Sequence, residues 1–142
     1  MKHFILIIIA SIFLFAGCEK LINPLYKGNS TFQLADTFEV AYHQTVYNQS
    51  ENIAVNLNDV IGDSRCPIGL RCFWEGSAEI EFVFSIDIRD YKFSLNTFRG
   101  YTRDTTFADY NIKLINVNPY PHSEKTYSDT DYRASVVITK VK

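Results

Sequence analysis

The chain has 142 residues, of which 46% are hydrophobic and 15% aromatic, and its formal net charge is −2. Since domains usually hold about 100–200 residues, this length is typical of one domain. The near-neutral charge excludes the basic surface that nucleic-acid binding requires, so no nucleic-acid partner is expected. Six glycines and four prolines are too few for a disordered chain. The odd number of cysteines, three, requires an explanation.

The first 18 residues have the pattern of an export signal. Lys2 provides a positive start, and an apolar run from Phe4 to Ala16 follows, interrupted by Ser11 alone. This run is too short to cross a bilayer as a helix, which takes about 20 residues, but it suits a secretory signal peptide. It ends in small residues directly before Cys18, an arrangement that resembles the lipobox of bacterial lipoproteins. A buried N-terminal strand or helix with an incidental cysteine is the alternative.

The lipobox resemblance implies three segments. Residues 1–17 would be a lipoprotein signal peptide, and residues 18–31 would comprise the lipidated Cys18 and a tether. Residues 32–142 would form the folded domain. Acyl chains such as palmitate on Cys18 would exceed the roughly two signals that stable membrane attachment needs. The expected location is therefore the bacterial cell envelope, lipid-anchored to a membrane and either periplasmic or surface-exposed.

From Phe32 onward, hydrophobic residues alternate with polar ones at a period of two, which predicts β-strands. Several short strands separated by turn sequences, without a long helical pattern, predict an all-β fold, a single antiparallel β-sandwich or a barrel-like domain. The expected strand segments are Ile53–Leu57, Ala78–Asp90, Tyr91–Leu95, Ile112–Leu114 and Tyr132–Ile138, and the expected turns are Ile61–Asp63, Arg89–Asp90, Arg99–Gly100, Asn118–Pro119 and Pro121–Ser123.

The segment from Asp63 to Gly76 carries the most specific pattern in the chain. Cys66 and Cys72 are separated by five residues, and outside the cytoplasm such a pair is expected to form a disulfide. The chain between them must double back, and Pro67 and Gly69 supply the turn chemistry. A zinc site is the alternative, which the spacing and the supply of only two thiols disfavour.

Trp74 and Gly76, which follow Cys72, allow two further predictions. Trp74 stands two positions beyond Cys72 and would share its face on an extended chain. We therefore expect the indole to pack over the disulfide and to close one end of the core. Gly76 predicts a bulge or a close approach of backbone.

The order Asp-Ser-Arg-Cys-Pro at positions 63–67, followed by Cys72, Trp74 and Gly76, resembles a group of small bacterial secreted proteins and lipoproteins of largely unknown activity. Their pattern often has glycine where this sequence has His43, so the turn geometry there is an open question. The resemblance implies a compact β-domain in the cell envelope. It brings no catalytic residues.

Basic and aromatic residues near the cysteines are candidates for binding. Arg65 and Arg71 bracket the disulfide loop and could hold a carboxylate or a phosphate in a forked geometry. Alternatively, Arg65 pairs with Asp63 or Glu75 and pins the loop. Tyr101 lies in a loop-like stretch and could stack on a sugar or a protein partner, although tyrosine is also an ordinary strand residue. The candidate contact residues are Arg65, Arg71, Trp74 and Tyr101.

Catalytic constellations are sparse. His43 and His122 both adjoin turn sequences and lack a nucleophile motif, so each is interpreted as a surface histidine. Glu79 and Glu81 share one strand face and, with Glu75, could supply the carboxylate pair of a glycoside hydrolase. The same spacing fits the solvated side of an amphipathic strand.

Calcium is a further alternative, because Asp59 and Asp63 flank a glycine and Asp129 and Asp131 precede the last strand. Turns also use aspartate for their own hydrogen bonds, so no metal and no cofactor are expected. The resulting hypothesis is a lipid-anchored, non-enzymatic binding domain that contacts an envelope protein or a glycan through its disulfide loop. An envelope hydrolase using Glu75 and Glu79 is one alternative, and a purely structural envelope component is another.

Overall fold

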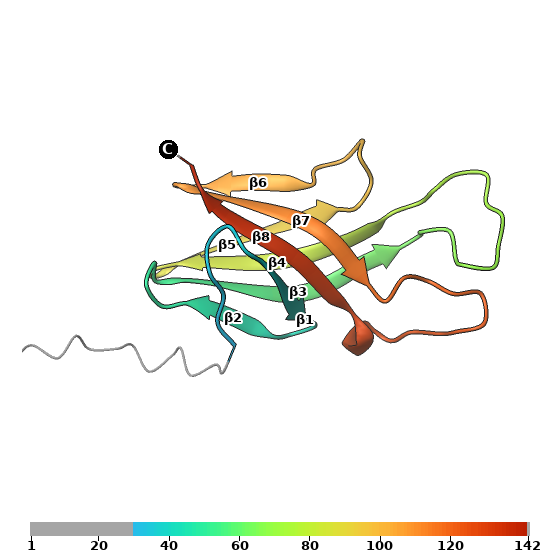
Figure 1. Cartoon of the computed structure of the whole chain (residues 1–142), viewed down its shortest axis with the longest axis horizontal. Coiled ribbons are helices and arrows are strands. Elements are labelled where there is room, and N and C mark those ends of the chain that lie inside the picture. The colour runs from blue at the N-terminus through green and yellow to red at the C-terminus, as the bar shows by residue number, and fades with distance from the viewer. Residues whose placement is uncertain (1–29, 142) are drawn as a thin grey trace, which may run out of the picture.

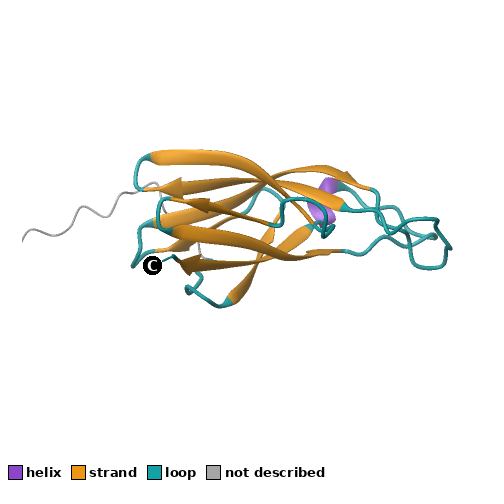
Figure 2. Ribbon diagram, turned by 90° about the horizontal axis from the view of Figure 1, so that it is seen from above, coloured by secondary structure: helices purple, strands orange, loops and turns teal. Residues whose placement is uncertain are grey.

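Two antiparallel sheets of four strands each pack face to face in the computed structural model, which describes residues 30–141 (Figure 1, Figure 2). The expected signal peptide, Cys18 and the tether up to residue 29 lie outside the described residues. The strands are β1 (Thr37–Ala41), β2 (Thr45–Asn48), β3 (Ile53–Asp63), β4 (Ala78–Ile86), β5 (Arg89–Asn96), β6 (Asp104–Phe107), β7 (Tyr110–Asn118) and β8 (Arg133–Lys140), and a 3-10 turn covers Asp129–Asp131.

The strand order is β1-β8-β7-β6 in one sheet and β2-β3-β4-β5 in the other. Each sheet turns its alternating β-branched and aromatic side chains inward. Ile80, Phe82 and Phe84 of β4 are 0% exposed, as are Val136 and Ile138 of β8. These residues belong to one core cluster between the sheets. The predicted all-β sandwich is confirmed, and the two sheets are separate rather than joined into a closed barrel.

The hairpin between β4 and β5 turns earlier than the sequence predicts. The expected turn at Arg89–Asp90 is wrong, because Arg89 already pairs with Ile86 and the turn lies at Asp87–Ile88. Asp87 takes a φ of 55°, which aspartate tolerates better than most residues, and its carboxylate accepts a hydrogen bond from Asn52 at 2.7 Å. Alternation along the expected strand Ala78–Asp90 would place Ile88 on the same face as Ile80, but in the turn its side chain is 93% exposed.

A second expected turn, at Ile61–Asp63, is also wrong. These residues continue β3, and the register shift between Val60 and Gly62 is a β-bulge in which Ile61 has no register partner while Gly62 pairs with Glu79. Asp63 then pairs with Ala78 of β4. Strand β3 therefore continues past the bulge to Asp63, and the cysteine-containing loop begins directly after it.

The turn at His43 keeps a glycine-like backbone. His43 adopts a φ of 56°, in the left-handed region that glycine enters freely, and its ring stacks on Tyr42 at 4.0 Å. His43 therefore forms the left-handed turn even though the resembling proteins often have glycine at this position.

Contact with the domain begins before residue 32. The Ser30 carbonyl accepts a hydrogen bond from the Tyr47 amide at 3.1 Å, and Thr31 forms an isolated bridge with the same residue. The last two residues of the expected tether therefore lie against β2.

Candidate functional site

Two loops from different sheets lie side by side at one end of the sandwich. Residues 64–77 connect β3 with β4, and residues 119–132 connect β7 with β8 (Figure 1). The Ile68 amide donates to the Pro121 carbonyl at 2.9 Å, and the Ser123 amide donates to the Ile68 carbonyl at 3.0 Å. This pairing joins the two sheets beyond the ends of their strands.

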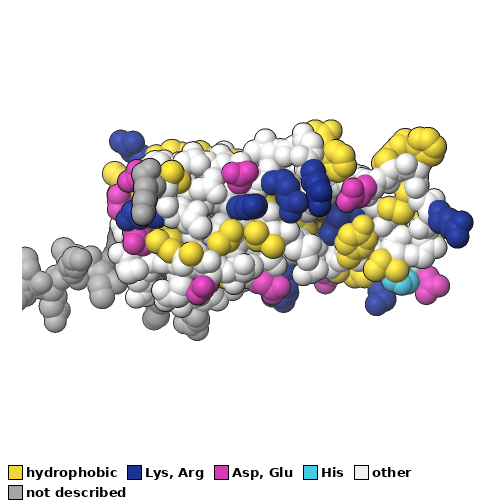
Figure 3. All heavy atoms as spheres, turned by 45° about the horizontal axis from the view of Figure 1, so that its top comes forward, with side chains coloured by type: hydrophobic (Ala, Val, Ile, Leu, Met, Phe, Trp, Pro, Cys, Tyr) yellow, Lys and Arg dark blue, Asp and Glu magenta, His cyan; other side chains and the backbone are white. Residues whose placement is uncertain are grey.

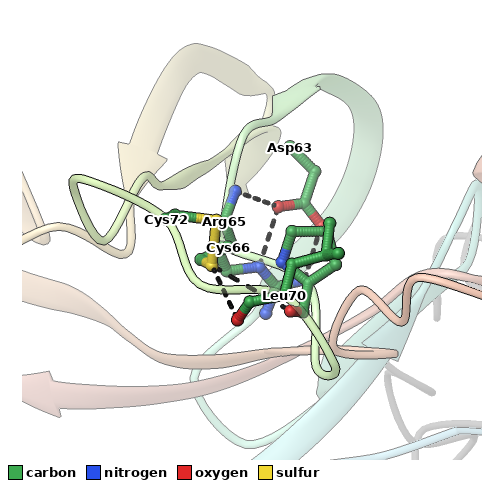
Figure 4. Close-up of a disulfide and its surroundings, with 6 residues drawn as sticks. Asp63, Arg65, Cys66, Leu70 and Cys72 are labelled. Atoms are coloured by element: carbon green, nitrogen blue, oxygen red, sulfur yellow. Dashed lines mark hydrogen bonds and ion pairs between the residues drawn. A yellow bond between two sulfur atoms is a disulfide. The ribbon is translucent and has the colours of Figure 1, made fainter.

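Arg65 holds the base of the first loop. Its side chain is 5% exposed, and its Nε and Nη2 atoms donate to the two carboxylate oxygens of Asp63 at 2.8 and 2.6 Å (Figure 4). Nη1 donates to the Val117 carbonyl at 2.6 Å, and Nη2 also donates to the Pro119 carbonyl at 2.8 Å. One guanidinium therefore ties β3 to the end of β7, and the charge-assisted bonds are of the strong bidentate kind.

Two tyrosines complete the surroundings of this ion pair. The Arg65 guanidinium lies 4.7 Å from the centre of the Tyr120 ring. The Tyr132 hydroxyl donates to Asp63 Oδ2 at 3.1 Å. Burial and the nearby negative charge of Asp63 raise the pKa of Tyr132 to about 12, so the phenol stays protonated and keeps donating at neutral pH.

These contacts decide between the two roles that the sequence left open for Arg65. The ion-pair partner of Arg65 is Asp63, not Glu75. The remaining hydrogen bonds of the guanidinium go to backbone carbonyls of the same chain. Arg65 is consequently removed from the candidate contact residues, because its charge is buried within the fold. Arg71, by contrast, lies on the exposed part of the loop.

The disulfide predicted between Cys66 and Cys72 is present, with 5.8 Å between the Cα atoms. A loop this short contributes about 2 kcal/mol on the chain-entropy estimate, so its main effect is local rigidity. Backbone hydrogen bonds also join the two sides of the loop near its base. The Ser64 amide donates to the Ser77 carbonyl at 2.7 Å, and the Cys66 amide donates to the Glu75 carbonyl at 3.0 Å.

Gly76 confirms the predicted close approach of backbone. Its φ is 69°, and a Cβ atom placed there would overlap the Ser64 carbonyl and come within 2.9 Å of Arg65 Cα. The two sides of the loop are packed so closely that no side chain fits between them.

The tip of this loop presents large apolar side chains to solvent, and we call Ile68, Leu70, Phe73 and Trp74 the apolar tip. Phe73 is 98% exposed and Trp74 is 75% exposed, with their rings edge to face at 6.1 Å. Figure 3 shows apolar side chains gathered at the outer end of the molecule. Most scattered surface hydrophobes need no explanation, but a cluster on one rigid loop is a mark of an interaction site.

The expectation that Trp74 packs over the disulfide is therefore wrong. Residues 73 and 74 form a bend, so the alternation of an extended chain does not hold there, and the indole leaves the face of Cys72. Leu70 and Phe73 are also exposed on this loop, and neither was among the predicted contact residues. A signal for them was present, because a turn-forming segment with proline and glycine is an unusual place for so many large hydrophobes.

Tyr101 lies in another loop at the same end, between β5 and β6. It is exposed and packs against Phe98, with ring centres 5.8 Å apart. It lines a cavity together with Arg99 and Arg103. Tyr101 thus lies on a different surface from the apolar tip.

The carboxylates of the hydrolase alternative have ordinary structural partners. Glu81 accepts hydrogen bonds from Lys92 at 2.8 Å and Asn58 at 2.6 Å, and the Lys92 bond in particular lowers the pKa of Glu81. Glu79 accepts a bond from Ser94 at 2.7 Å. A general acid needs a raised pKa, so Glu81 is shifted in the wrong direction for that role. Glu75 is exposed on the loop.

The aspartates of the calcium alternative are also engaged. Asp63 binds Arg65, and Asp131 accepts bonds from the amide and hydroxyl of Ser128 at 2.8 and 3.0 Å, which lower the pKa of Asp131. Asp59 accepts a bond from the Val60 amide at 2.9 Å. Within residues 30–141, no group of three or more His, Cys, Asp or Glu side chains is placed to hold a metal ion.

No protein-family model matches the chain, and the searches of curated proteins and of solved structures likewise found no match. Over the part of the chain that the structure describes, no helix has the length and apolarity to cross a membrane.

Proposed function

We propose that this protein is a lipid-anchored, non-enzymatic binding module of a bacterial cell envelope, and that its apolar tip contacts a protein partner. The observation that carries the proposal is the exposure of four large apolar side chains on a loop whose base is held by a disulfide and a buried ion pair. A rigid loop loses little conformational entropy on binding, and exposed aromatic side chains are the residue types that dominate interfaces.

The position of the tip relative to the expected anchor supports this proposal. Ser30, where the described chain begins, bonds to Tyr47, and Tyr47 pairs with Ala54 near the start of β3. The cysteine loop begins after Asp63, nine residues further along the same strand. At about 3.3 Å per residue, this separation is about 30 Å. A domain held through Cys18 would thus present its apolar tip away from the attachment point.

The charges around the tip favour a protein partner over an anionic bilayer. The basic side chains Arg71 and Lys125 are matched by the acidic side chains Glu75 and Glu124, all of them exposed. Loops that insert into anionic membranes carry an excess of basic residues, whereas the two basic side chains beside the apolar tip are balanced by two acidic ones. A mixed-charge rim around an apolar centre is the usual anatomy of a protein interface.

Site-specific photo-crosslinking tests the contact. We expect a photoreactive amino acid at position 74 of the full chain, in living cells, to give a discrete protein adduct. Leu70→Ser in the same chain should reduce that adduct about tenfold, since it removes buried apolar area worth roughly 1.5–3 kcal/mol.

Ile88 offers the matched control, because it is 93% exposed and lies at the β4–β5 turn. A crosslinker at position 88 should not give the adduct. The proposal is contradicted if both positions yield the same products, or if the adducts from position 74 are lipids.

The membrane anchor has a separate test. Cys18→Ser should abolish incorporation of labelled palmitate and leave the uncleaved chain, because the thioether forms on that sulfur. The double variant Cys66→Ser/Cys72→Ser should keep the label, since these two cysteines bond to each other. Metabolic labelling followed by membrane fractionation measures both. Labelled Cys18→Ser protein would contradict the assignment.

A further inference from the structure

A cavity of about 490 Å³ lies on the outer face of the β6–β7 hairpin. Lys113 and Ile115 of β7 face it, and Leu114 between them is buried in the core, so the cavity is on the side away from the other sheet. The β5–β6 loop provides the opposite wall. The residues that line the cavity include Arg99, Tyr101, Arg103, Asp104, Lys113 and Ile115.

The cavity gathers three cations against one carboxylate. Lys113 is the register partner of Asp104, yet no ion pair between them is formed. The ion pairs within residues 30–141 involve Arg65, Lys92 and Lys140 as the cations. Arg99, Arg103 and Lys113 have no ion-pair partner in this part of the chain. Figure 3 shows a row of basic side chains across this face. In a chain of net charge −2, such a concentration of positive charge attracts an anion.

Arg103 adds a donor that is already withdrawn from water. Its Nη2 atom donates to the carbonyls of Leu114 at 3.4 Å and Ile115 at 3.1 Å, where a bulge interrupts the β7–β8 register. Its Nε is buried and has no hydrogen-bond partner in the described part of the chain. A buried donor without an acceptor is costly. Arg103 also lines the cavity, so its positive charge adds to those of Arg99 and Lys113 there.

We propose that this cavity binds a small phosphate monoester that carries a polar ring, namely a sugar phosphate. Phosphate oxygens suit guanidinium and ammonium donors, and the excess of two positive charges matches a dianion. Ligand cavities span about 300–1,000 Å³, so this one has room for more than the phosphate. The exposed ring of Tyr101 and the side chain of Ile115 face the remaining space, and the Asp104 carboxylate is an acceptor for a sugar hydroxyl.

This site is distinct from the apolar tip, and its test does not depend on the proposed function. Calorimetric titration of the full-length protein should show binding of glucose 6-phosphate, weaker binding of inorganic phosphate and no binding of glucose. Lys113→Gln and Arg99→Gln should each weaken glucose 6-phosphate binding about tenfold, the effect of losing one charge-assisted hydrogen bond. Neither side chain makes a hydrogen bond or ion pair within residues 30–141, so both variants should fold normally.

Lys92→Gln is the matched control, because it removes the same charge from β5 in the other sheet. It should leave the affinity unchanged. The proposal is overturned if glucose 6-phosphate gives no binding heat, or if Lys92→Gln weakens binding as much as Lys113→Gln. Equal affinity for inorganic phosphate would also overturn it, because the sugar would then contribute nothing and the cavity would hold an adventitious ion only.

Discussion

Arg65→Met is expected to lower the free energy of unfolding by about 3–5 kcal/mol, the usual cost of removing one partner of a buried ion pair. The variant leaves the Asp63 carboxylate, whose side chain is 6% exposed, without its main counter-charge. It also leaves the Val117 and Pro119 carbonyls without the guanidinium donors. Methionine keeps an unbranched apolar side chain in place of the aliphatic stem of arginine, so the loss would arise from charge and hydrogen bonding more than from packing of that stem. Equilibrium unfolding in urea measures the effect.

Two comparison variants separate this effect from the general loss of a salt bridge. Lys92→Met breaks the ion pair with Glu81, in which the lysine side chain is 61% exposed, and should cost less than about 1 kcal/mol. The double variant Arg65→Met/Asp63→Leu should recover much of the loss, because it leaves no unpaired charge. If Arg65→Met costs no more than Lys92→Met, the buried ion pair does not hold the loop.

Gly76→Ala is expected to destabilise the protein by about 3 kcal/mol, at the upper end of the cost of a left-handed conformation for a residue with a side chain. The positive φ of 69° is one cause. The other is steric, because the new methyl group would overlap the Ser64 carbonyl, and backbone on both sides of the loop would have to separate. The separation would break the pairing of Ser64 with Ser77. Thermal unfolding measures the loss, and amide exchange of the loop locates it.

Gly62→Ala is the control for this substitution. A Cβ atom at Gly62 would meet no heavy atom within 4 Å, and its φ is not in the positive region. We expect a change within about 0.5 kcal/mol, as for ordinary surface positions. A Gly76→Ala protein as stable as the Gly62→Ala protein would show that the loop relaxes freely, and the close approach would then carry no structural weight.

The strands were predictable where one face of the sheet is buried. The alternation of Ile80, Phe82 and Phe84 already predicts β4, since a period of two places all three on one face. Turn sequences were less informative. A glycine or an aspartate signals a departure from regular backbone, but Gly62 follows a bulge within β3 and Asp87 forms the hairpin turn. Both uses suit the same residue types, and only strand pairing distinguishes them.

The disulfide and the backbone geometry of the candidate site were predictable from the sequence, but the exposure of its side chains was not. The Cys66–Cys72 pairing followed from spacing and compartment, and the close approach at Gly76 followed from the residue type. The exposure of Trp74 did not, because a side chain on a loop faces solvent or protein according to the loop's path. The cavity at Arg99, Arg103 and Lys113 was missed for a related reason: these residues come from a loop and a strand that are adjacent only in the folded sheet.

The sequence by itself determined five of the eight strands in the described residues, the all-β class and the disulfide, because alternation and cysteine spacing are local properties of the chain. It also carries the export and lipidation signal that we propose at Cys18. Only the tertiary structure decided that Arg65 is a buried tie between two sheets and that the apolar tip is left in solvent. Burial depends on which distant segments pack together, and residues 63–77 contact residues 117–123 only because the two sheets place them at the same end of the fold.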